Sequence, residues 1–475
     1  MTPVAPDPDP PPPPTAPAVY TYGWDTVFVI PATDVNRAIV DHKSSPPRFS
    51  VDEPDFTVSG DFGDWQITMG GDGKNVRLAL PLSAVHVAYK STGKRYDFTS
   101  GRAIIEVALH YIPHTESSGS DGDPYALVVK DTASSPSDPA VTMVQMTLDP
   151  TPGTVTLAIA QQALDDWCNA NLAQFQHVFA VVDLNRRVDT GQWAFVTPNY
   201  TSYGYLDGAD LASSLFGVLT MTGDRTGEQL SEQLSVSAIP TTSKAGFLVS
   251  QERTLLDLVR PAIIQTYKGL NDQNFLVSDD HTELYLENGV TVDLAPVESH
   301  GSTYYPTLKQ LTVKSTGNIL TLTCFTETPV GLGLTAVTQS THWYTVDLGA
   351  AKSGQTLVFA EAQPPSIVHD VRQSPGSQLT QLIIEIAAAV ALVLLTVLTD
   401  GAALIVGGLV IGLLLGADQI VPALIEKVNT DDSPSIDLLQ VNAVDPIQWT
   451  GSASFKLDSA SLNVSLQLGG DPLFA

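Results

Sequence analysis

Along the C-terminal part of this chain, hydrophobic and polar residues alternate with a period of two. Leu462, Val464, Leu466 and Leu468 point to one side of an extended chain, and the polar residues between them point to the other. The same period recurs upstream, at Ile447, Trp449, Phe455 and Leu457. Strands this long and this two-faced predict an antiparallel sheet with one wet face and one apolar face, which helices, a second sheet or a ligand would cover.

A period near 3.6 residues appears in three other stretches and predicts helices. Val35, Ala38, Ile39 and His42 form the apolar side of a short helix that begins near Thr33. Residues 160–175 and 247–259 show similar spacing. Because no alternating βαβ rhythm appears, we expect an α+β fold in which long antiparallel strands accompany a few long amphipathic helices.

Two shorter segments also predict strands. Trp65, Ile67 and Val76, Leu78 alternate with polar residues on either side of the glycine-rich sequence GGDGKN, which predicts a hairpin. Cys324 lies in a second alternating run, so we expect a buried, unreactive thiol.

The apolar block from Leu382 to Ala417 has only two charges, Glu385 and Asp400. Such a block is a membrane span, a buried helical pair or a surface that meets lipid. A spanning helix needs about 20 apolar residues, and the uncharged run 386–399 is too short. Asp400-Gly401 indicates a break between two helices. We therefore expect residues 382–417 to form an apolar helical hairpin within the fold.

Three glycines in this block, Gly408, Gly412 and Gly416, are four residues apart and would form one stripe on a helix. Small residues at this spacing let two helices approach closely, in a membrane or in a tight core. The three glycines are therefore candidates for membrane contact or helix packing. Glu385 and Asp400 disfavour permanent insertion, and conditional insertion stays open.

Composition narrows the possible partners. The chain has 475 residues, with 23 Lys and Arg against 51 Asp and Glu, a formal net charge of −28. A negative field of this size repels phosphate backbones, so we expect no nucleic-acid partner. It also disfavours binding to anionic membranes by charge alone. Cys168 and Cys324 are far apart, so neither a disulfide framework nor a zinc site is indicated.

Residues 1–19 form a proline-rich tail, which we expect to be disordered. It could serve as a ligand for a module that binds polyproline II helices, although a plain flexible leader is the simpler interpretation. The N-terminus lacks the basic start and apolar core of a secretory signal. We therefore expect synthesis in the cytoplasm, with any release by a non-classical route.

Catalytic signals are weak. The chain contains no phosphate-binding loop, dinucleotide fingerprint, zinc-protease motif or nucleophile elbow. His110 and His114 are four apart, but Pro113 interrupts a helix that would stack them. Asp121 and Asp123 lie in a loop whose solvation explains them. We expect no enzyme activity, no catalytic residues, no metal and no cofactor.

Several stretches together resemble a known family. TYGWDTVFVI, DVNRAIV, KSSPPRFS, GDFGDWQITMGGDGKNVRLALP, NLAQFQHVFAVVDLN, PNYTSYGY and LFGVLTMTGDR occur in this order over about the first half of the chain. They are similar to the clostridial forty-seven-kilodalton protein family of the OrfX-type botulinum neurotoxin gene clusters. The run WQITMGGDGKN makes this likeness more specific than a short motif would.

The resemblance implies a tubular lipid-binding (TULIP) fold, in which a long, curved antiparallel sheet wraps around a long helix. Residues 20–475 would form this elongated domain, with two lobes and a boundary near 205–245. Relatives in such clusters are associated with phosphoinositide binding, and related loci with insecticidal toxins. No catalytic residue carries over from the family.

The first functional hypothesis is a non-enzymatic lipid-binding or membrane-associating protein that accompanies a toxin. Each buried CH₂ of an acyl chain would contribute about 0.8 kcal/mol. The candidate residues lining such a site are Trp449, Phe455, Leu462, Val464, Leu466 and Leu468. Two alternatives stay open: a membrane-inserting, pore-forming toxin component, and a scaffold with a sealed core that binds other proteins of the toxin cluster.

Overall fold

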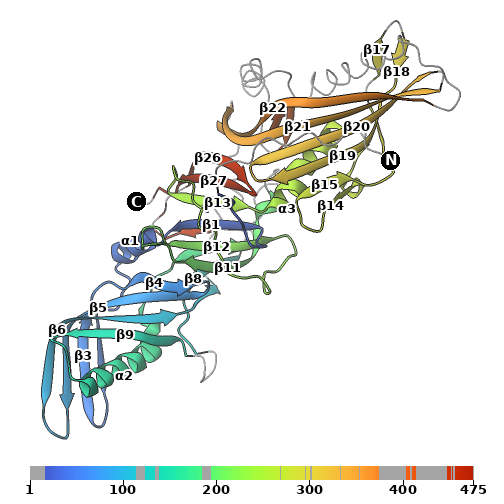
Figure 1. The fold of residues 1–475 in the computed structure, drawn as a ribbon. Helices are drawn as coiled ribbons and strands as arrows, with labels where there is room; N and C mark the ends of the chain where they lie inside the picture. Colours follow the sequence, from blue (N-terminus) through green and yellow to red (C-terminus); the bar gives the residue numbers. More distant parts are fainter. Residues whose placement is uncertain are drawn as a thin grey trace.

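The computed structural model of the chain describes residues 17–113, 123–133, 139–184, 194–373, 403–406, 409–412, 447–450, 452 and 455–473, apart from positions 268, 295, 300–301, 332 and 352–353. The molecule is elongated and consists mainly of β-sheets that follow one another along its long axis (Figure 1). We call the sheet at one end the distal sheet, the sheet in the middle the central sheet and the sheet at the other end the large sheet.

The distal sheet has six strands. They are β2 (Arg48–Asp52), β3 (Phe56–Phe62), β4 (Gln66–Asp72), β5 (Asn75–Tyr89), β6 (Arg95–Val107) and β9 (Val141–Asp149). Their order is β2-β3-β5-β6-β9, with β4 paired to β5. The predicted hairpin is confirmed, since Ile67 pairs with Leu78. Both side chains are buried in the main core.

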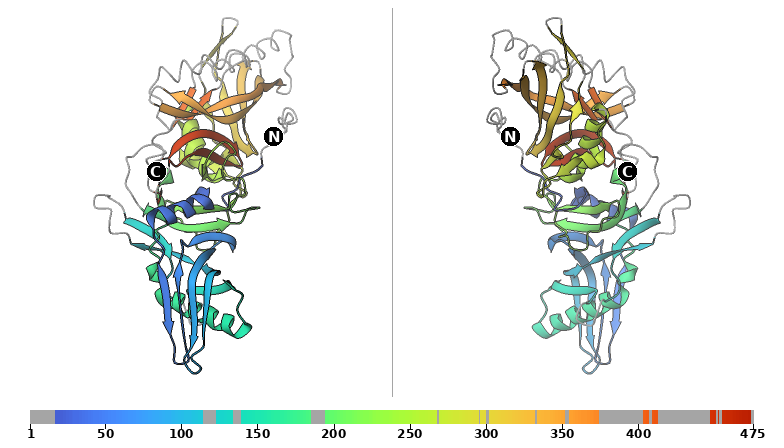
Figure 2. Two further views of the ribbon diagram at one scale, coloured as in Figure 1. Left: turned by 90° about the vertical axis from the view of Figure 1, so that its left-hand side faces the viewer. Right: turned by 90° about the vertical axis from the view of Figure 1, so that its right-hand side faces the viewer.

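Helix α2 (Thr154–Asn171) packs against the distal sheet (Figures 1 and 2). Its apolar side consists of Ala160, Ala163, Leu164, Trp167 and Cys168, which recur at helical spacing and are buried. The Trp167 ring lies 5.2 Å from the Phe62 ring. The helix begins six residues before the predicted start, because residues 150–153 (PTPG) end the preceding strand and Gly153 occupies the N-cap position.

The central sheet joins segments that are far apart in the sequence. Its order is β11-β12-β1-β13-β27-β26. The strands are β11 (Pro198–Leu206), β12 (Leu215–Thr222), β1 (Thr26–Pro31), β13 (Ala245–Val249), β27 (Ser465–Asp471) and β26 (Lys456–Asn463). The predicted lobe boundary near 205–245 therefore falls within the strands and connections of this sheet, and the division into two lobes stays a prediction.

A smaller four-stranded sheet has the order β25-β10-β8-β7. Its strands are β25 (Ile447–Trp449), β10 (Ala180–Leu184), β8 (Asp123–Val129) and β7 (Leu109–Pro113). Strand β25 again returns from the C-terminal part of the chain to pair with an early segment.

The large sheet has nine strands and is strongly curled (Figures 1 and 2). They are β14 (Phe275–Val277), β15 (Glu283–Leu286), β16 (Val292–Asp293), β19 (Thr307–Thr316), β20 (Ile319–Gly331), β21 (Leu334–Ala351), β22 (Gly354–Gln373), β23 (Ala403–Val406) and β24 (Leu409–Gly412). A separate pair consists of β17 (Val297–Ser299) and β18 (Ser302–Tyr304). Cys324 lies on β20 and is buried, and burial raises the pKa of its thiol to about 12, as expected of an unreactive residue.

Helices are few in the described part of the chain, and the predicted long amphipathic helices inside a wrapped sheet are not found. Helix α1 (Ala32–His42) confirms the predicted short helix. A continuous helical segment follows β13. It consists of α3 (Gln251–Arg253), the π-helical η3 (Thr254–Val259) and α4 (Arg260–Thr266). Short 3₁₀ turns are η1 (Leu172–Gln174), η2 (Ala194–Val196) and η4 (Asp272–Asn274).

The predicted helix at 247–259 is therefore wrong at its start. Phe247 lies on β13, and the helix begins only after Ser250, whose side chain accepts a hydrogen bond from the Arg253 amide at 3.2 Å. The sequence AGFLV is buried on both sides of the sheet. A strand buried on both faces loses its alternation, so its apolar run resembles the start of a buried helix.

The predicted helical hairpin at 382–417 is wrong where the structure describes it. Residues 403–406 and 409–412 are strands β23 and β24, and Val406 pairs with Leu409. Strand β24 extends β22 in parallel. The physical reason is local: two short runs of Leu, Ile and Val flank Gly407-Gly408, and a Gly-Gly pair between such runs favours a two-residue hairpin. The other residues of the block, Gly408 and Gly416 included, lie outside the described residues.

Candidate functional site

Most of the residues predicted to line a lipid site lie in the main hydrophobic core. Trp449, Phe455, Leu462, Leu466 and Leu468 are all buried there. Phe28 of β1 lies at the centre of this cluster. Its ring centroid is 5.2 Å from Phe455, 5.6 Å from Trp449 and 5.9 Å from Phe247. These edge-to-face contacts fill the predicted lipid-lining face with the protein's own aromatic rings.

Val464 departs from the prediction. Residues 460–468 form not one long strand but the hairpin β26–β27, in which Leu462 pairs with Leu466. Val464 lies at the turn with a φ of 73° and is only half-buried. Its amide donates to the Gly317 carbonyl at 2.7 Å, which ties the turn to the β19–β20 connection of the large sheet. Cross-strand partners share a face, so the leucines still point the same way.

The polar side of this hairpin is not wet, contrary to the prediction. Asn463 and Gln467 are 8% and 4% exposed. Asn463 Nδ2 donates to Gln467 Oε1 at 2.9 Å, and Gln467 Nε2 donates to the carbonyls of Ser237 and Ala238 at 2.7 and 3.2 Å. Buried amides need such partners. The polar residues therefore hold another segment of the chain, which covers this face.

That segment, residues 231–240, crosses the outer face of the central sheet, and we call it the strap. Leu234 and Ala238 are its buried apolar residues and join a second, smaller core with Trp24, Val27 and Val29. The Trp24 indole donates to the Ser231 carbonyl at 3.0 Å. Alternate residues of β1 thus enter two different cores, which explains why residues 27–30 are apolar without alternation.

The strap lies in a trench formed by a row of small residues. Gly204, Gly217, Gly246 and Gly469 are on neighbouring positions of β11, β12, β13 and β27, with Val29 of β1 in the middle of the row. A Cβ atom at Gly204 would lie 2.7 Å from the Glu232 carbonyl oxygen, and one at Gly246 would overlap the Ala238 carbonyl. Only glycine lets the two main chains approach this closely.

An ion-pair chain links the central sheet to the large sheet. Asp25, 1% exposed, accepts hydrogen bonds from the Thr222 amide at 2.8 Å and the Thr222 hydroxyl at 2.9 Å, and it pairs with Arg225. Arg225 also contacts Glu252 of α3 at 3.2 Å. Glu252 Oε1 lies 3.5 Å from Nδ1 of His281, in the β14–β15 connection. The Thr222 hydrogen bonds and the Arg225 pair satisfy the charge of Asp25, which would otherwise be buried alone.

The π-helical segment η3 carries a second ionic group, Asp257. Burial raises the pKa of this carboxyl to about 6, although Arg253 pairs with it and Arg253, Arg260 and Arg225 all favour its charged form. Arg260 also pairs with Asp272 at 3.1 Å. A perturbed carboxyl on a π-helix resembles the setting of some catalytic groups. Here each neighbouring cation has an acidic partner, which is typical of a structural network.

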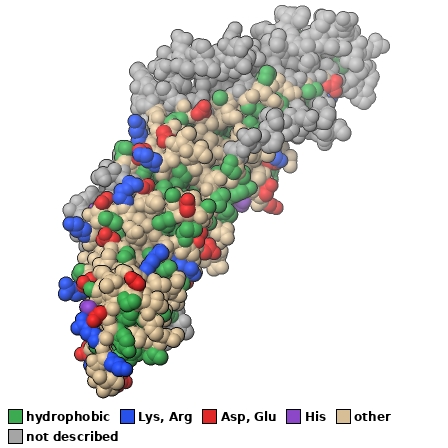
Figure 3. Space-filling view, turned by 60° about the vertical axis from the view of Figure 1, so that its left-hand side comes forward, with side chains coloured by type: hydrophobic (Ala, Val, Ile, Leu, Met, Phe, Trp, Pro, Cys, Tyr) green, Lys and Arg blue, Asp and Glu red, His purple; other side chains and the backbone are tan. Residues whose placement is uncertain are grey.

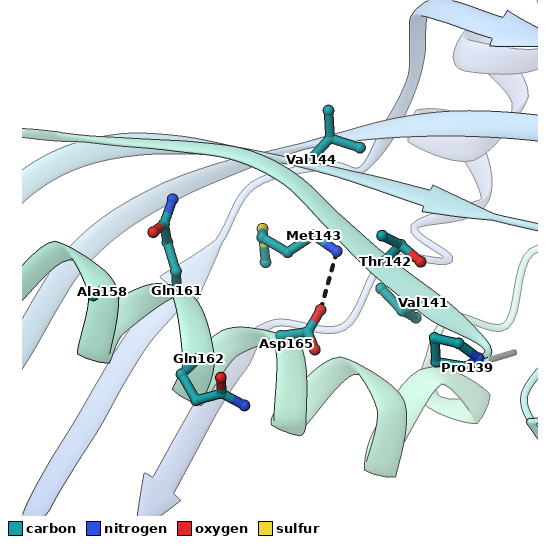
Figure 4. A pocket seen from close by; sticks show the side chains of 9 residues that line it. All are labelled: Pro139, Val141, Thr142, Met143, Val144, Ala158, Gln161, Gln162 and Asp165. Carbon is teal, nitrogen blue, oxygen red and sulfur yellow. Dashed lines mark hydrogen bonds between the residues drawn. The ribbon is translucent and has the colours of Figure 1, made fainter. Parts of the chain in front are cut away.

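A groove of about 410 Å³ lies between α2 and the edge strand β9 (Figure 4). It is lined by Pro139, Val141, Thr142, Met143, Val144, Ala158, Gln161, Gln162 and Asp165. Asp165 accepts a hydrogen bond from the Met143 amide at 3.0 Å, so its carboxylate satisfies a backbone donor on the unpaired edge of β9. Burial raises the pKa of this carboxyl. Asp165 is the only charged side chain among these lining residues, and no histidine, cysteine or lysine lies beside the Thr142 hydroxyl in that set.

No group of three or more His, Cys, Asp or Glu side chains in the described part of the chain is arranged to hold a metal ion. The two most buried histidines lie in apolar surroundings. Burial lowers the pKa of His177 to about 3 and that of His342 to about 4. Nδ1 of His177 lies 2.9 Å from the Ser44 hydroxyl, so this histidine has a structural role.

Within the described residues, no helix is both long and apolar enough to cross a bilayer.

Sequence reasoning missed the strap, the glycine row and the buried Asp25. An acidic residue inside the apolar run TYGWDTVFVI was the available signal for Asp25, since a lone charge in such a run must find a partner. The glycine row had no comparable signal, because its members are spread over 265 positions and are aligned only by strand register.

Comparison with known proteins agrees with the resemblance noted in the sequence. A family profile described as OrfX-like, protein OrfX2/OrfX3/P47, matches residues 21–470. Protein OrfX3 of Paraclostridium bifermentans is 34% identical over 480 residues, covering 95% of this chain and 98% of that protein. Protein OrfX3 of Clostridium botulinum (strain Kyoto / Type A2) is 28% identical over 480 residues with the same coverage.

Solved structures show the same fold. The structure of P47 from Clostridium botulinum A2 matches with a TM-score of 0.68 at 16% identity, covering 96% of this chain and 98% of that one. A lipopolysaccharide binding protein gives a TM-score of only 0.24, which supports no argument, so the relation to tubular lipid-binding proteins stays a prediction. By its profile match and its full-length relatives, the chain belongs to the OrfX2/OrfX3/P47 family, the OrfX family of botulinum toxin gene clusters.

Proposed function

We propose that this protein is a non-enzymatic accessory protein of a toxin gene cluster that acts by binding other proteins of that cluster. The observation that carries the proposal is the packing around Phe28. Five of the six side chains expected to line a lipid site, all but Val464, are buried in the protein's own core. In that core the rings of Phe247, Trp449 and Phe455 contact Phe28. A face that is filled in this way favours the sealed-core scaffold over an internal acyl site.

The surface and the ionic groups support the same proposal. Acidic and basic side chains are interspersed over the described part of the face shown in Figure 3, without a broad basic surface there for nucleic acid. The perturbed carboxyls Asp257 and Asp165 are engaged by Arg253 and by a backbone amide, respectively, rather than directed at a shared reaction centre.

Co-purification tests the proposal directly. The full-length chain would be mixed with each protein encoded beside it, and the mixtures analysed by size-exclusion chromatography with light scattering. We expect a stoichiometric complex with at least one of them, and no lipid by mass spectrometry of an organic extract. A chain that stays unbound to every cluster protein at about 10 μM, near a free energy of about −7 kcal/mol, would contradict the proposal.

Lipid contact is a second candidate function, and one observation favours it. The block 382–417 is long and apolar, with only two charges, Glu385 and Asp400. A lipid surface, with phosphoinositide among the headgroups to test, would then meet this block. Sedimentation with vesicles of neutral lipid, with and without phosphoinositide, measures it. Binding to either kind of vesicle would support lipid contact. Absence of binding to both kinds would exclude it at the lipid concentration used.

A membrane-inserting component is the stronger form of this second function. Dye release from the same vesicles would detect it. Gly412→Leu alters strand β24 and should reduce any leak if this hairpin enters the bilayer. A leak that Gly412→Leu leaves unchanged would rule out a role for this glycine.

A further inference from the structure

The chain makes a strained turn just before the central sheet. Thr21, Tyr22, Gly23 and Trp24 form a turn closed by a hydrogen bond from the Trp24 amide to the Thr21 carbonyl at 3.1 Å. Tyr22 and Gly23 both have positive φ, 52° and 92°. This turn type favours Asn or Gly at its first central position, and a bulky residue there costs about 1–2 kcal/mol. Tyr22 is therefore an outlier that local stability does not explain.

The strain holds the Tyr22 ring in solvent beside another aromatic ring. Tyr20 and Tyr22 are 47% and 40% exposed, and their ring centroids lie 6.1 Å apart. Trp24, which closes the same turn, is buried and stacks on half-buried Tyr200, with centroids 6.1 Å apart. We call Tyr20 and Tyr22 the tyrosine surface.

This surface rests on a rigid base. The Val19 amide donates to the Asn463 carbonyl at 2.8 Å, and the Ser465 amide donates to the Val19 carbonyl at 3.2 Å, so the segment is clamped to the β26–β27 hairpin. The Trp24 indole is bonded to the strap. Aromatic residues held rigidly at a surface are typical of binding sites, because little side-chain entropy is lost when a ligand arrives.

We propose that the tyrosine surface binds a polyproline II segment, and that its occupant is the proline-rich segment of this chain, residues 3–14. This segment contains eight prolines, five of them consecutive at 10–14. Proline-rich segments dock on exposed aromatic rings because their extended helix is already formed and loses little entropy. The 6.1 Å between the two rings matches two residues of such a helix, which rises about 3.1 Å per residue.

Position in the chain supports this occupant. Pro17 begins the described part of the chain only three residues before Tyr20, so the segment is tethered at the surface and has a high effective concentration there. Its only charges, Asp7 and Asp9, precede the five consecutive prolines. The uncharged run 10–14 therefore suits an uncharged aromatic surface. The inference is independent of the proposed function, since it needs no other cluster protein.

The test uses the protein without residues 1–16 and a fluorescently labelled peptide of residues 1–16, which can bind only in trans. We expect saturable binding in fluorescence anisotropy at peptide concentrations below about 1 mM, near −4 kcal/mol. The double variant Tyr20→Ala/Tyr22→Gly should weaken it at least tenfold. Glycine suits the positive φ at position 22, so this variant should keep its fold and melting temperature.

Two controls make the result specific. Tyr305→Ala removes a more exposed tyrosine elsewhere, 67% exposed, and should leave binding unchanged. A peptide in which Pro10 to Pro14 are all alanine keeps both charges and should not bind. Absence of binding by the truncated protein at 1 mM peptide would overturn the proposal, as would equal binding by the tyrosine variant or by the alanine peptide.

Discussion

A methyl group added at Gly246 should release the strap from the central sheet. The Cβ of Gly246→Ala would overlap the Ala238 carbonyl oxygen and lie 2.9 Å from its carbonyl carbon. Both atoms are backbone, so no side-chain rotation relieves the clash, and the strap must move. Movement breaks the hydrogen bonds from Gln467 to the Ser237 and Ala238 carbonyls.

The magnitude follows from what the strap loses. Each broken hydrogen bond costs about 1 kcal/mol net. Exposure of Leu234, now 3% exposed, adds about 1.5–3 kcal/mol. We therefore expect Gly246→Ala to lower the free energy of unfolding by about 3–5 kcal/mol. Urea unfolding followed by tryptophan fluorescence measures it, and Trp24, bonded to the strap, should report the change in the folded state as well.

Two matched variants separate strap release from a general effect of Gly→Ala. Gly153→Ala adds the same methyl where no atom lies within 4 Å, at the N-cap of α2, and should cost less than about 1 kcal/mol. Leu234→Ala alone should cost about 2–5 kcal/mol but much less in the Gly246→Ala background, where the strap is already displaced. Wild-type stability of Gly246→Ala, or full additivity with Leu234→Ala, would refute the reasoning.

Three further predictions concern the buried groups. Phe28→Ala should lower the free energy of unfolding by about 3–5 kcal/mol, because it empties the centre of the ring cluster, and urea unfolding would show it. Arg225→Ala should cost about 3–5 kcal/mol by leaving Asp25 without its cation, and the double variant Asp25→Ala/Arg225→Ala should be less destabilised than the two single changes added together. The pKa of His177 is lowered to about 3, so its neutral form stabilises the fold fully above the unfolded pKa near 6.5, and about 1.4 kcal/mol is lost per pH unit as pH falls from there toward 3. His177→Gln should flatten this part of the curve of unfolding free energy against pH. The raised pKa of Asp257 has the opposite effect: its protonated carboxyl stabilises the fold at low pH, and that stability is lost as pH rises through about 6.

Local pattern was sufficient for several elements. The hairpin of β4 and β5 follows from alternation around GGDGKN, and α1 follows from its helical spacing. The leucines at 462, 466 and 468 were correctly placed on one apolar face, because cross-strand pairing in a hairpin preserves the side that each residue takes. Local pattern failed for Phe247 and for residues 403–406 and 409–412, where short apolar runs fit a buried strand and a buried helix equally well.

Residue patterns along the chain were enough to predict its sheet-forming character, the burial of its C-terminal leucines and its likeness to the toxin-cluster family, since these depend on nearest neighbours and on an uninterrupted run of residues. What covers each face of the sheets became visible only in the folded molecule. Strand register aligned Gly204, Gly217, Gly246 and Gly469 into a trench, and the strap filled it. Phe28, more than 400 positions from Phe455, filled the face that was expected to hold lipid. Such contacts depend on which distant segments meet, and residue patterns along the chain carry no record of that meeting.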